Sequence, residues 1–370
     1  MTRMSGEPAT VDQPPHIIDL FAGPGGLDVG ATWLDIPVTG IEWDSNACAT
    51  RRNAGLRTIQ ADVRSYGPSD FPDANVLTGG PPCQTFTVAG SGFGRRALHE
   101  VIRQASAMSD DLSNGAPRDG FDDDRTGLVL EPLRWALLAS ANGVPFQAIV
   151  LEQVPTVVPI WEAYGEILEK HGYGVDVGVL RTEEFGVPQT RRRAVLIARL
   201  GRANVTLPPP THQAYRRGAT KQDALGLRPW VSMGEALKRE GLFTVISNYG
   251  SGGDPRNRGE RTSDEPSATV TGKVMRNRLR LANQGEDRLT HREAGRLQTF
   301  PHDYPWSGND IGQQIGNAIP PRLAVHVLAQ ALGIKLDIDE LDRTVDASWV
   351  TGRSVPLRRG FADQVPVILD

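Results

Sequence analysis

The chain has 370 residues, of which 39% are hydrophobic and 23% charged, and its formal net charge is −4. This length can bury a sizeable core without disulfides or a structural metal. The two cysteines, Cys48 and Cys83, fit no disulfide or metal-ligand pattern, which predicts a reducing compartment and no metal site. The N-terminal stretch is polar and no continuous apolar run is long enough to cross a membrane, so we expect a soluble, cytoplasmic and monomeric protein without a membrane partner.

The charge is unevenly distributed along the chain. Residues 186–300 contain 21 Lys and Arg against 10 Asp and Glu, a net charge of +11, and the remaining residues carry −15. A basic block in an acidic chain favours binding to a polyanion such as nucleic acid, although an Arg-rich solvated face would have the same composition.

The first predicted strand, residues 16–21, runs into the glycine-rich turn Ala22-Gly23-Pro24-Gly25-Gly26-Leu27-Asp28. A strand, a glycine turn and a helix in this order are typical of a nucleotide-binding loop. The turn is neither G-x-G-x-x-G nor a P-loop. Glu42 ends the next strand and Asp62 follows the third, where each acid could bind a ribose or base edge, although strand-end acids are common. These features predict a nucleoside cofactor that has no pyrophosphate for the loop to bind, and S-adenosylmethionine is such a cofactor.

The stretch Gly79-Gly80-Pro81-Pro82-Cys83-Gln84 follows a fourth buried strand and places a thiol at the carboxyl edge of the sheet. Taken alone, Cys83 is more simply a small buried hydrophobe that ends a strand. Residues 84–100 have the glycine-rich composition of a mobile loop, and we expect a helix and an exposed insertion over 101–125.

Downstream, helices and strands continue to alternate, which predicts an α/β fold with a mixed, mostly parallel sheet. The expected elements are helices at 127–141, 158–171, 289–299 and 322–333 and strands at 145–151, 174–180 and 194–198. Glu152 ends a central strand, and Gln189-Thr190-Arg191-Arg192-Arg193 precedes the last one. The basic segment 200–285 has little periodicity and is predicted to be a separate, loop-rich small domain.

The order of these pieces resembles the cytosine-C5 DNA methyltransferase family over residues 17–333. Six segments carry the resemblance: Asp19–Gly26, Gly80–Gln84, Glu152–Val154, Gln189–Arg193, Arg292–Pro301 and Gln314–Ala318. It implies a Rossmann-like class I methyltransferase domain at 15–199 and 286–335, a target-recognition domain at 200–285 that binds double-stranded DNA, and a C-terminal tail at 336–370.

The resemblance implies catalytic roles for Cys83, Glu152, Arg191 and Arg193. Cys83 would add to carbon 6 of a cytosine flipped out of the duplex, and Glu152 would be held protonated at N3. Arg193 would bind the base oxygen O2, Arg191 would support it, and the loop 84–100 would close over the base.

The resemblance also implies an S-adenosylmethionine site. Phe21 would stack on the adenine, Glu42 would bind the ribose and Asp62 the adenine amine. Asn317 would lie near the methionine part. The residues expected to bind the cofactor are Phe21, Ala22, Gly23, Pro24, Gly26, Leu27, Glu42, Trp43, Asp62, Val63, Gly80, Pro82, Asn317 and Ala318.

Two features depart from the family pattern or leave alternatives open. Gln153 stands where the family usually has Asn, and Phe86-Thr87 is similar to the tRNA-methylating branch, so RNA is an alternative substrate. A catalytically inactive DNA-binding module is a second alternative, which the presence of Cys83, Glu152 and Arg193 disfavours. A thiol-dependent oxidoreductase is a third, and it lacks the dinucleotide motif. The sequence does not decide whether a cognate restriction endonuclease accompanies the chain.

Overall fold

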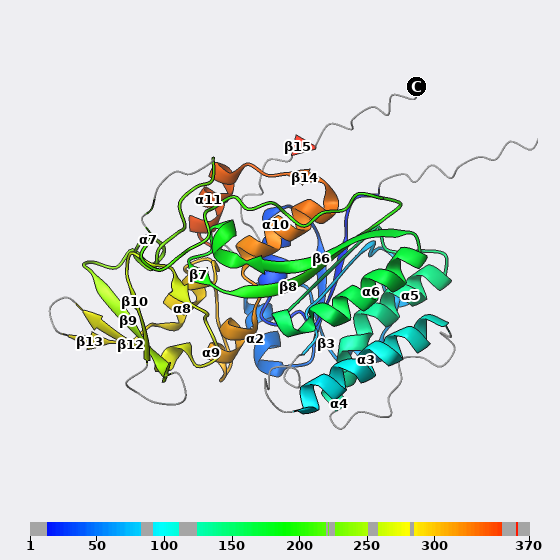
Figure 1. The fold of residues 1–370 in the computed structure, drawn as a ribbon, viewed down its shortest axis with the longest axis horizontal. Coiled ribbons are helices and arrows are strands. Elements are labelled where there is room, and N and C mark those ends of the chain that lie inside the picture. Colours follow the sequence, from blue (N-terminus) through cyan, green and yellow to red (C-terminus); the bar gives the residue numbers. More distant parts are fainter. Residues whose placement is uncertain are drawn as a thin grey trace, which may run out of the picture.

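The protein is represented by a computed structural model with a large and a smaller unit side by side (Figure 1). The structure describes residues 13–82, 92–110, 124–219, 221, 226–250, 258–281, 285–349 and 360–361. Cys83 and the segments 84–91 and 111–123 lie outside the described residues.

The large unit is built on a seven-stranded sheet in the order β3-β2-β1-β4-β5-β8-β6. Its strands are β1 (Ile17–Leu20), β2 (Val38–Glu42), β3 (Thr58–Gln60), β4 (Val76–Gly79), β5 (Ala148–Gln153), β6 (Tyr173–Arg181) and β8 (Arg192–Leu200). The first five strands in this order are parallel, and β8 runs antiparallel to both β5 and β6. The predicted mixed, mostly parallel sheet is confirmed.

Helices cover both faces of this sheet. One face packs against α3 (Gly92–Asp110), α5 (Glu131–Ala141) and α6 (Val158–Lys170), and the other against α1 (Gly26–Trp33) and α10 (Pro321–Leu332). Side chains alternate between the two faces along a strand, so in β8 Leu196 packs toward α6 while Val195 and Ile197 pack toward α10. Both faces are apolar, which explains why the strands read as continuous hydrophobic runs. Two further helices of this part are α2 (Ser45–Asn53) and α4 (Asp124–Gly127).

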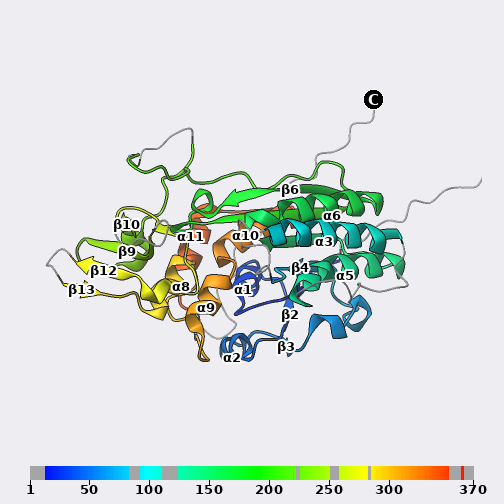
Figure 2. The same cartoon turned by 60° about the horizontal axis from the view of Figure 1, so that its bottom comes forward.

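The small unit contains a four-stranded antiparallel sheet in the order β10-β9-β12-β13, which lies away from α3, α5 and α6 (Figure 2). Its strands are β9 (Phe243–Gly250), β10 (Arg258–Thr262), β12 (Arg278–Leu281) and β13 (Glu286–Asp287), and its helices are α7 (Met233–Leu237), α8 (His291–Leu297) and α9 (Ile311–Asn317). A separate core joins them, with Met233, Val245, Leu279, Leu297 and Ile315 among its members.

Several segments connect the two units. The short strands β7 (Gln189–Thr190) and β11 (Ser267–Ala268) pair in parallel, and α10 returns the chain to the large sheet. After it come β14 (Ile334–Lys335), α11 (Ile338–Asp346) and β15 (Gly360–Phe361). Leu289 and α9 pack with the small unit, whereas Val205 and Leu207 pack against the large one. The division at residues 200 and 285 remains a prediction.

The elements differ from the expectation at α3 and in the small unit, and α9 lies where no helix was expected. Residues 92–100, expected to be part of a mobile loop, are helical and form the first half of α3. Val101, Ala105 and Met108 of the same helix are buried at helical spacing, so packing on the sheet accounts for the helix despite its glycine-rich start. The strands of the small unit were not predicted individually. No helix in the described part of the chain combines the length and apolar character needed to cross a membrane.

Candidate active site

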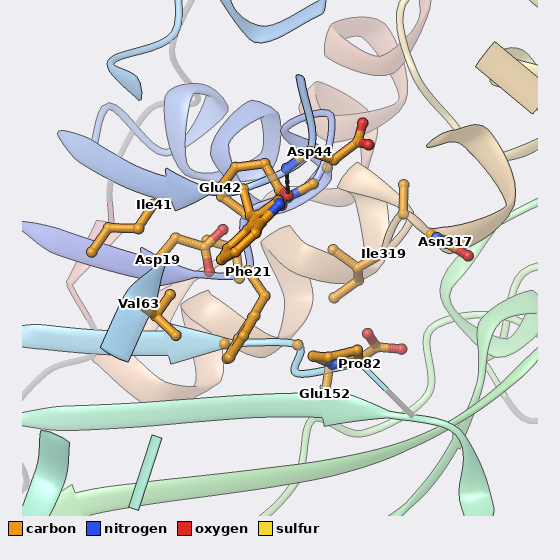
Figure 3. Close-up of a pocket in the computed structure, with 18 of the residues that line it drawn as sticks. Asp19, Phe21, Ile41, Glu42, Asp44, Val63, Pro82, Glu152, Asn317 and Ile319 are labelled. Carbon is orange, nitrogen blue, oxygen red and sulfur yellow. Dashed lines mark hydrogen bonds between the residues drawn. The ribbon is translucent and has the colours of Figure 1, made fainter. Parts of the chain in front are cut away.

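A cavity of about 680 Å³ opens at the carboxyl ends of β1, β2, β4 and β5 (Figure 3). Parallel strands place the residues that follow them at one edge of a sheet, which is why segments far apart in sequence meet here. All of the residues expected to bind a cofactor line this cavity: Phe21, Ala22, Gly23, Pro24, Gly26, Leu27, Glu42, Trp43, Asp62, Val63, Gly80, Pro82, Asn317 and Ala318. Glu152 and Arg193 line it as well.

The glycine turn after β1 requires unusual backbone angles. Phe21, Gly23 and Gly25 have φ of +60°, +54° and +101°. A Cβ on Gly25 would lie 2.3 Å from the Leu56 side chain, so this position is restricted to glycine by both its angle and its space. The strained Phe21 sits directly at the cavity, where strain of this kind is commonly found in functional sites.

Glu42 organises one wall of the cavity. Its Oε2 accepts a hydrogen bond from the Gly23 amide at 2.7 Å, and its Oε1 accepts one from the Asp44 amide at 2.7 Å. The carboxylate therefore ties the end of β2 to the glycine turn of β1. Figure 3 shows Glu42 beside Asp44 at the edge of the cavity.

Beneath the glycine turn lies a buried ion pair that sequence reasoning missed. Asp28 Oδ1 and Arg51 Nη2 are 2.6 Å apart, and both side chains are almost fully buried. Arg51 also donates to the Ala22 carbonyl at 3.3 Å, and the Tyr304 hydroxyl donates to the Pro24 carbonyl at 2.5 Å. These groups hold the turn from below, but they come from segments up to 280 residues apart, so no local pattern indicates them.

Another part of the cavity lining combines apolar side chains with the ion pair between Asp62 and Arg64. Asp62 accepts hydrogen bonds from Arg64 with an oxygen–nitrogen distance of 2.6 Å, and Val63 is buried beside it. Trp43 is 67% exposed, which is high for an indole. Phe21 and Val63 offer apolar contact within the same cavity (Figure 3).

Asp19 is a pocket residue to which the sequence analysis gave no role. It is buried at the end of β1 and accepts a hydrogen bond from the Thr78 hydroxyl at 2.6 Å. Burial, reinforced by the charge of Asp28, raises the pKa of Asp19 to about 8. The raised pKa favours the protonated form of this carboxyl. Its position inside a buried strand gave no signal that it faces a pocket.

Glu152 and Arg193 form an ion pair at the end of β5. Arg193 Nε lies 2.5 Å from Glu152 Oε1, and the side chains are 12% and 13% exposed, respectively. The pair arises because Glu152 in β5 lies beside Val195 in the antiparallel β8, near the start of that strand. Gly80 packs closely against Glu152, since a Cβ there would lie 3.5 Å from the Glu152 carbonyl oxygen.

Gln153 holds the turn that leads to Cys83. Its Nε2 donates a short hydrogen bond to the Pro81 carbonyl, and its Oε1 accepts one from the Val154 amide at 2.7 Å. The residue that departs from the family's usual Asn is therefore engaged with the backbone of the Pro-Pro turn. Pro82, the last described residue before Cys83, lines the cavity near Glu152 (Figure 3).

Arg191 does not line the cavity. Its guanidinium is buried and donates to three backbone carbonyls: Val270 at 3.0 Å, Gly316 at 2.9 Å and Ala318 at 3.2 Å. Burial lowers the pKa of Arg191, and the positive charge of Arg193 lowers it further. Arg191 therefore joins the segment around Val270 to the segment that carries Asn317 and Ala318.

Solved structures with a similar fold are methyltransferases. The S. pombe Dnmt2 methyltransferase superimposes with a TM-score of 0.58 over 86% of this chain and 98% of that chain, at 17% identity. A putative DNA modification methyltransferase encoded within a prophage of E. coli gives 0.54 over 85% and 98%, at 19% identity. At these identities the likeness shows the fold, which is the Rossmann-like methyltransferase fold.

The sequence comparisons define the family. The family model for C-5 cytosine-specific DNA methylase matches residues 16–226 and 220–332, so the chain belongs to that family. The Type II methyltransferase M1.HphI of Haemophilus parahaemolyticus is 28% identical over 87% of both chains, and M.MthTI of Methanothermobacter thermautotrophicus is 26% identical over 87% of this chain and 98% of its own. The protein is a DNA cytosine-5 methyltransferase.

Proposed function

We propose that this chain transfers a methyl group from S-adenosylmethionine to carbon 5 of a cytosine flipped out of double-stranded DNA, through a covalent adduct with Cys83. The observation that carries the proposal is the Glu152–Arg193 pair beside Pro82, in the same cavity as the glycine turn and Glu42. One cavity thus contains groups suited to a pyrimidine ring and groups suited to a nucleoside.

The donor set of the cavity fits S-adenosylmethionine. Glu42 and Asp62 offer carboxylate acceptors to ribose hydroxyls and an adenine amine, and Phe21 offers an aromatic face to the purine. Gly23 and Gly26 let a ligand approach the backbone at the start of α1, and Asn317 offers an amide at the opposite side. When bound, S-adenosylmethionine supplies an electrophilic methyl group on a sulfonium.

The chain's own residues then activate the cytosine. The Cys83 thiolate adds to C6 and forms a C–S bond, which moves the ring π electrons toward C5 and makes C5 nucleophilic. Glu152 in its acid form donates a proton to N3 as negative charge develops there, and Arg193 donates hydrogen bonds to O2. After C5 is methylated, a base removes the C5 proton, the C–S bond breaks and the N3 proton returns to Glu152, which restores the neutral aromatic ring and releases the Cys83 thiolate.

We infer that the small unit recognises DNA. The segment 186–300 carries a net charge of +11 in an otherwise acidic chain, which favours binding to a phosphate backbone. A target carbon inside the duplex is shielded, so the base must be flipped into the cavity. The Gln153–Pro81 hydrogen bond supports the proposed placement of Cys83, because it anchors the residues immediately before it.

Bisulfite sequencing of genomic DNA from cells that express the protein tests substrate and sequence specificity together. We expect protected cytosines within one short sequence, and we expect none in cells that express Cys83→Ala. Methylation by the Cys83→Ala protein would contradict the mechanism. Methylated tRNA with unmodified DNA in the same cells would favour the RNA alternative.

Glu152→Gln isolates the acid. It keeps the size of the side chain and removes the transferable proton, so we expect kcat to fall by about 10² to 10⁴ with cofactor affinity retained. A turnover rate near that of the wild type would remove Glu152 from its role.

A further inference from the structure

The C-terminal segment 336–349 lies beyond the residues that the family model matches, which end at 332. Its helix α11 lies between α10 and the small unit in both views of the fold (Figures 1 and 2). The cavity residues described above do not include it. Its contacts nevertheless reach both units.

The apolar side of this segment belongs to the large unit. Leu341 and Val345 of α11 and the following Trp349 are buried in the core formed by α1 and α10. Trp349 donates from its indole to the Ala54 carbonyl at 3.1 Å, and its ring packs against Tyr304 with centroids 5.7 Å apart. Since Tyr304 donates to the Pro24 carbonyl, the segment is anchored directly behind the cofactor turn.

The acidic side of α11 reaches across to the small unit. Asp346 lies 3.1 Å from Lys238, at the end of α7, and 2.6 Å from Arg296 of α8. The Arg296 guanidinium also donates to the Val345 carbonyl at 2.6 Å. Both helices belong to the small unit's core, to which Met233 and Leu297 contribute.

Asp342 links α10 of the large unit to the segment that leads to α7 of the small unit. Its two oxygens pair with Arg322 of α10 at 2.5 Å and with Arg228, in the segment that leads to α7, at 2.7 Å. Arg228 also pairs with Asp339 at 2.6 Å. Three carboxylates on one helix, at positions 339, 342 and 346, therefore hold four cationic side chains from both units. A network of this kind can contribute where an isolated exposed pair would not.

We propose that α11 is a clasp that fixes the orientation of the small unit relative to the catalytic cavity, with Asp342 and Asp346 as positioning residues. The clasp consists of Asp339, Asp342 and Asp346 with Arg228, Lys238, Arg296 and Arg322. This inference rests on the proposed function, because it assigns DNA recognition to the small unit. Without the clasp, the small unit also adopts orientations in which the flipped base does not meet the cavity. The fraction of molecules that can bind DNA productively then falls, and the apparent affinity for DNA falls with it.

Long-range electrostatics predicts the opposite change in DNA affinity when carboxylates of the clasp are removed, which makes the clasp testable. The double variant Asp342→Asn/Asp346→Asn removes two negative charges, and general attraction to DNA would then strengthen. The clasp instead predicts a KM for DNA about five-fold or more above that of the wild type. The affinity for S-adenosylmethionine, measured by calorimetry, should stay within about two-fold, because these residues do not line the cavity.

The matched control is Glu162→Gln/Glu166→Gln, which removes two exposed carboxylates from α6 on the opposite face of the sheet. Methylation of plasmid DNA from a strain without cytosine methylation gives KM and kcat for each protein. The Lys238→Met variant, alone and combined with Asp346→Asn, completes a double-mutant cycle. A clasp predicts non-additive losses, whereas an independent DNA contact by Lys238 predicts additive ones.

A KM for DNA equal to or below that of the wild type in Asp342→Asn/Asp346→Asn would overturn the proposal. Parallel loss of cofactor affinity and of thermal stability would also overturn it, since that result indicates a role only in folding. If the wild-type protein binds labelled duplex DNA without methylating it, the proposed function fails. The clasp is then still judged by comparing DNA binding of the variants by fluorescence anisotropy.

Discussion

At the scale of single residues, Arg191 shows how an arginine close to the cavity can act by holding the backbone. Its guanidinium is buried and satisfies three carbonyls, of Val270, Gly316 and Ala318. The family resemblance implies a catalytic role for both arginines, with Arg193 on the base oxygen O2 and Arg191 in support, but of the two only Arg193 lines the cavity. Arg193 lies in β8 and its guanidinium pairs with Glu152, whereas Arg191 precedes that strand and its guanidinium is held by the three carbonyls.

Arg191→Met should therefore lower stability more than a surface arginine would. The change leaves three buried carbonyls without their donor, and we expect a loss of about 3 kcal/mol in the free energy of unfolding. Chemical denaturation measures this loss, with Arg192→Met as the control, since Arg192 is the next residue in the chain and is exposed. Equal stabilities for the two variants would show that these hydrogen bonds contribute little.

His212 predicts a specific dependence of stability on pH. Burial, reinforced by the neighbouring charges of Arg322 and Arg228, lowers its pKa from 6.5 to about 3. Between these values the unfolded chain binds a proton that the folded protein does not, so the stabilising contribution is complete above about pH 6.5 and is lost as pH falls toward 3. The loss is about 1.4 kcal/mol for each pH unit.

Denaturation of the wild type and His212→Gln at several pH values between 5 and 8 tests this. The difference between the two proteins should shrink or reverse as pH falls, because the variant lacks the titrating group. His99→Gln, on the exposed side of α3, should run parallel to the wild type across the range. A His212→Gln curve that also stays parallel would mean that the imidazole is solvated.

At the scale of elements, the contact between the start of α1 and the segment before α10 shapes the cavity. A Cβ on Gly26 would lie 2.2 Å from the Ile319 carbonyl oxygen, and Ile319 lines the cavity beside Ala318. Gly26→Ala should therefore push this segment away and weaken S-adenosylmethionine binding by about 10-fold or more. Calorimetric titration measures the change. Gly67→Ala, where an added Cβ meets nothing within 4 Å, should bind as the wild type does.

The same scale shows which elements a sequence can predict. The strands of the large sheet are continuous apolar runs because both faces are covered by helices, and their expected positions agree with β1 to β6 within a few residues. In β12 only Leu279 is fully buried, between Arg278 and Arg280, so its pattern resembles a charged loop. Strands with one solvated face and many arginines gave too little apolar signal to be recognised.

At the scale of the whole molecule, the cavity was predictable because the carboxyl ends of parallel strands must meet. Every expected cofactor residue therefore lines one pocket. The supports behind it were not predictable. Asp28 pairs with Arg51, and Tyr304 contacts Pro24 across 280 residues, which depends on how α2 and the segment after α8 return to the turn. Such contacts follow from tertiary packing and leave no periodic trace in the sequence.

The arrangement of charge over the whole molecule predicts how DNA binding responds to salt. The 3-10 turn Val274–Arg276 lies beside the cavity, because Gly272, just before it, packs against Gly316. Arg276 is exposed there. We expect it to contact a phosphate, so Arg276→Ala should weaken binding to all duplex sequences alike and reduce the slope of log K against log salt by about 1.

Fluorescence anisotropy at several salt concentrations measures this slope for duplexes with and without the methylated sequence. Lys170→Ala, at the end of α6, removes an exposed charge from the opposite side of the large sheet and should leave the slope unchanged. If Arg276→Ala weakens binding only to the methylated sequence, Arg276 reads a base edge, because a phosphate contact carries no sequence information. An unchanged slope and affinity would place the DNA away from this turn and would require a different surface of the small unit to face the duplex.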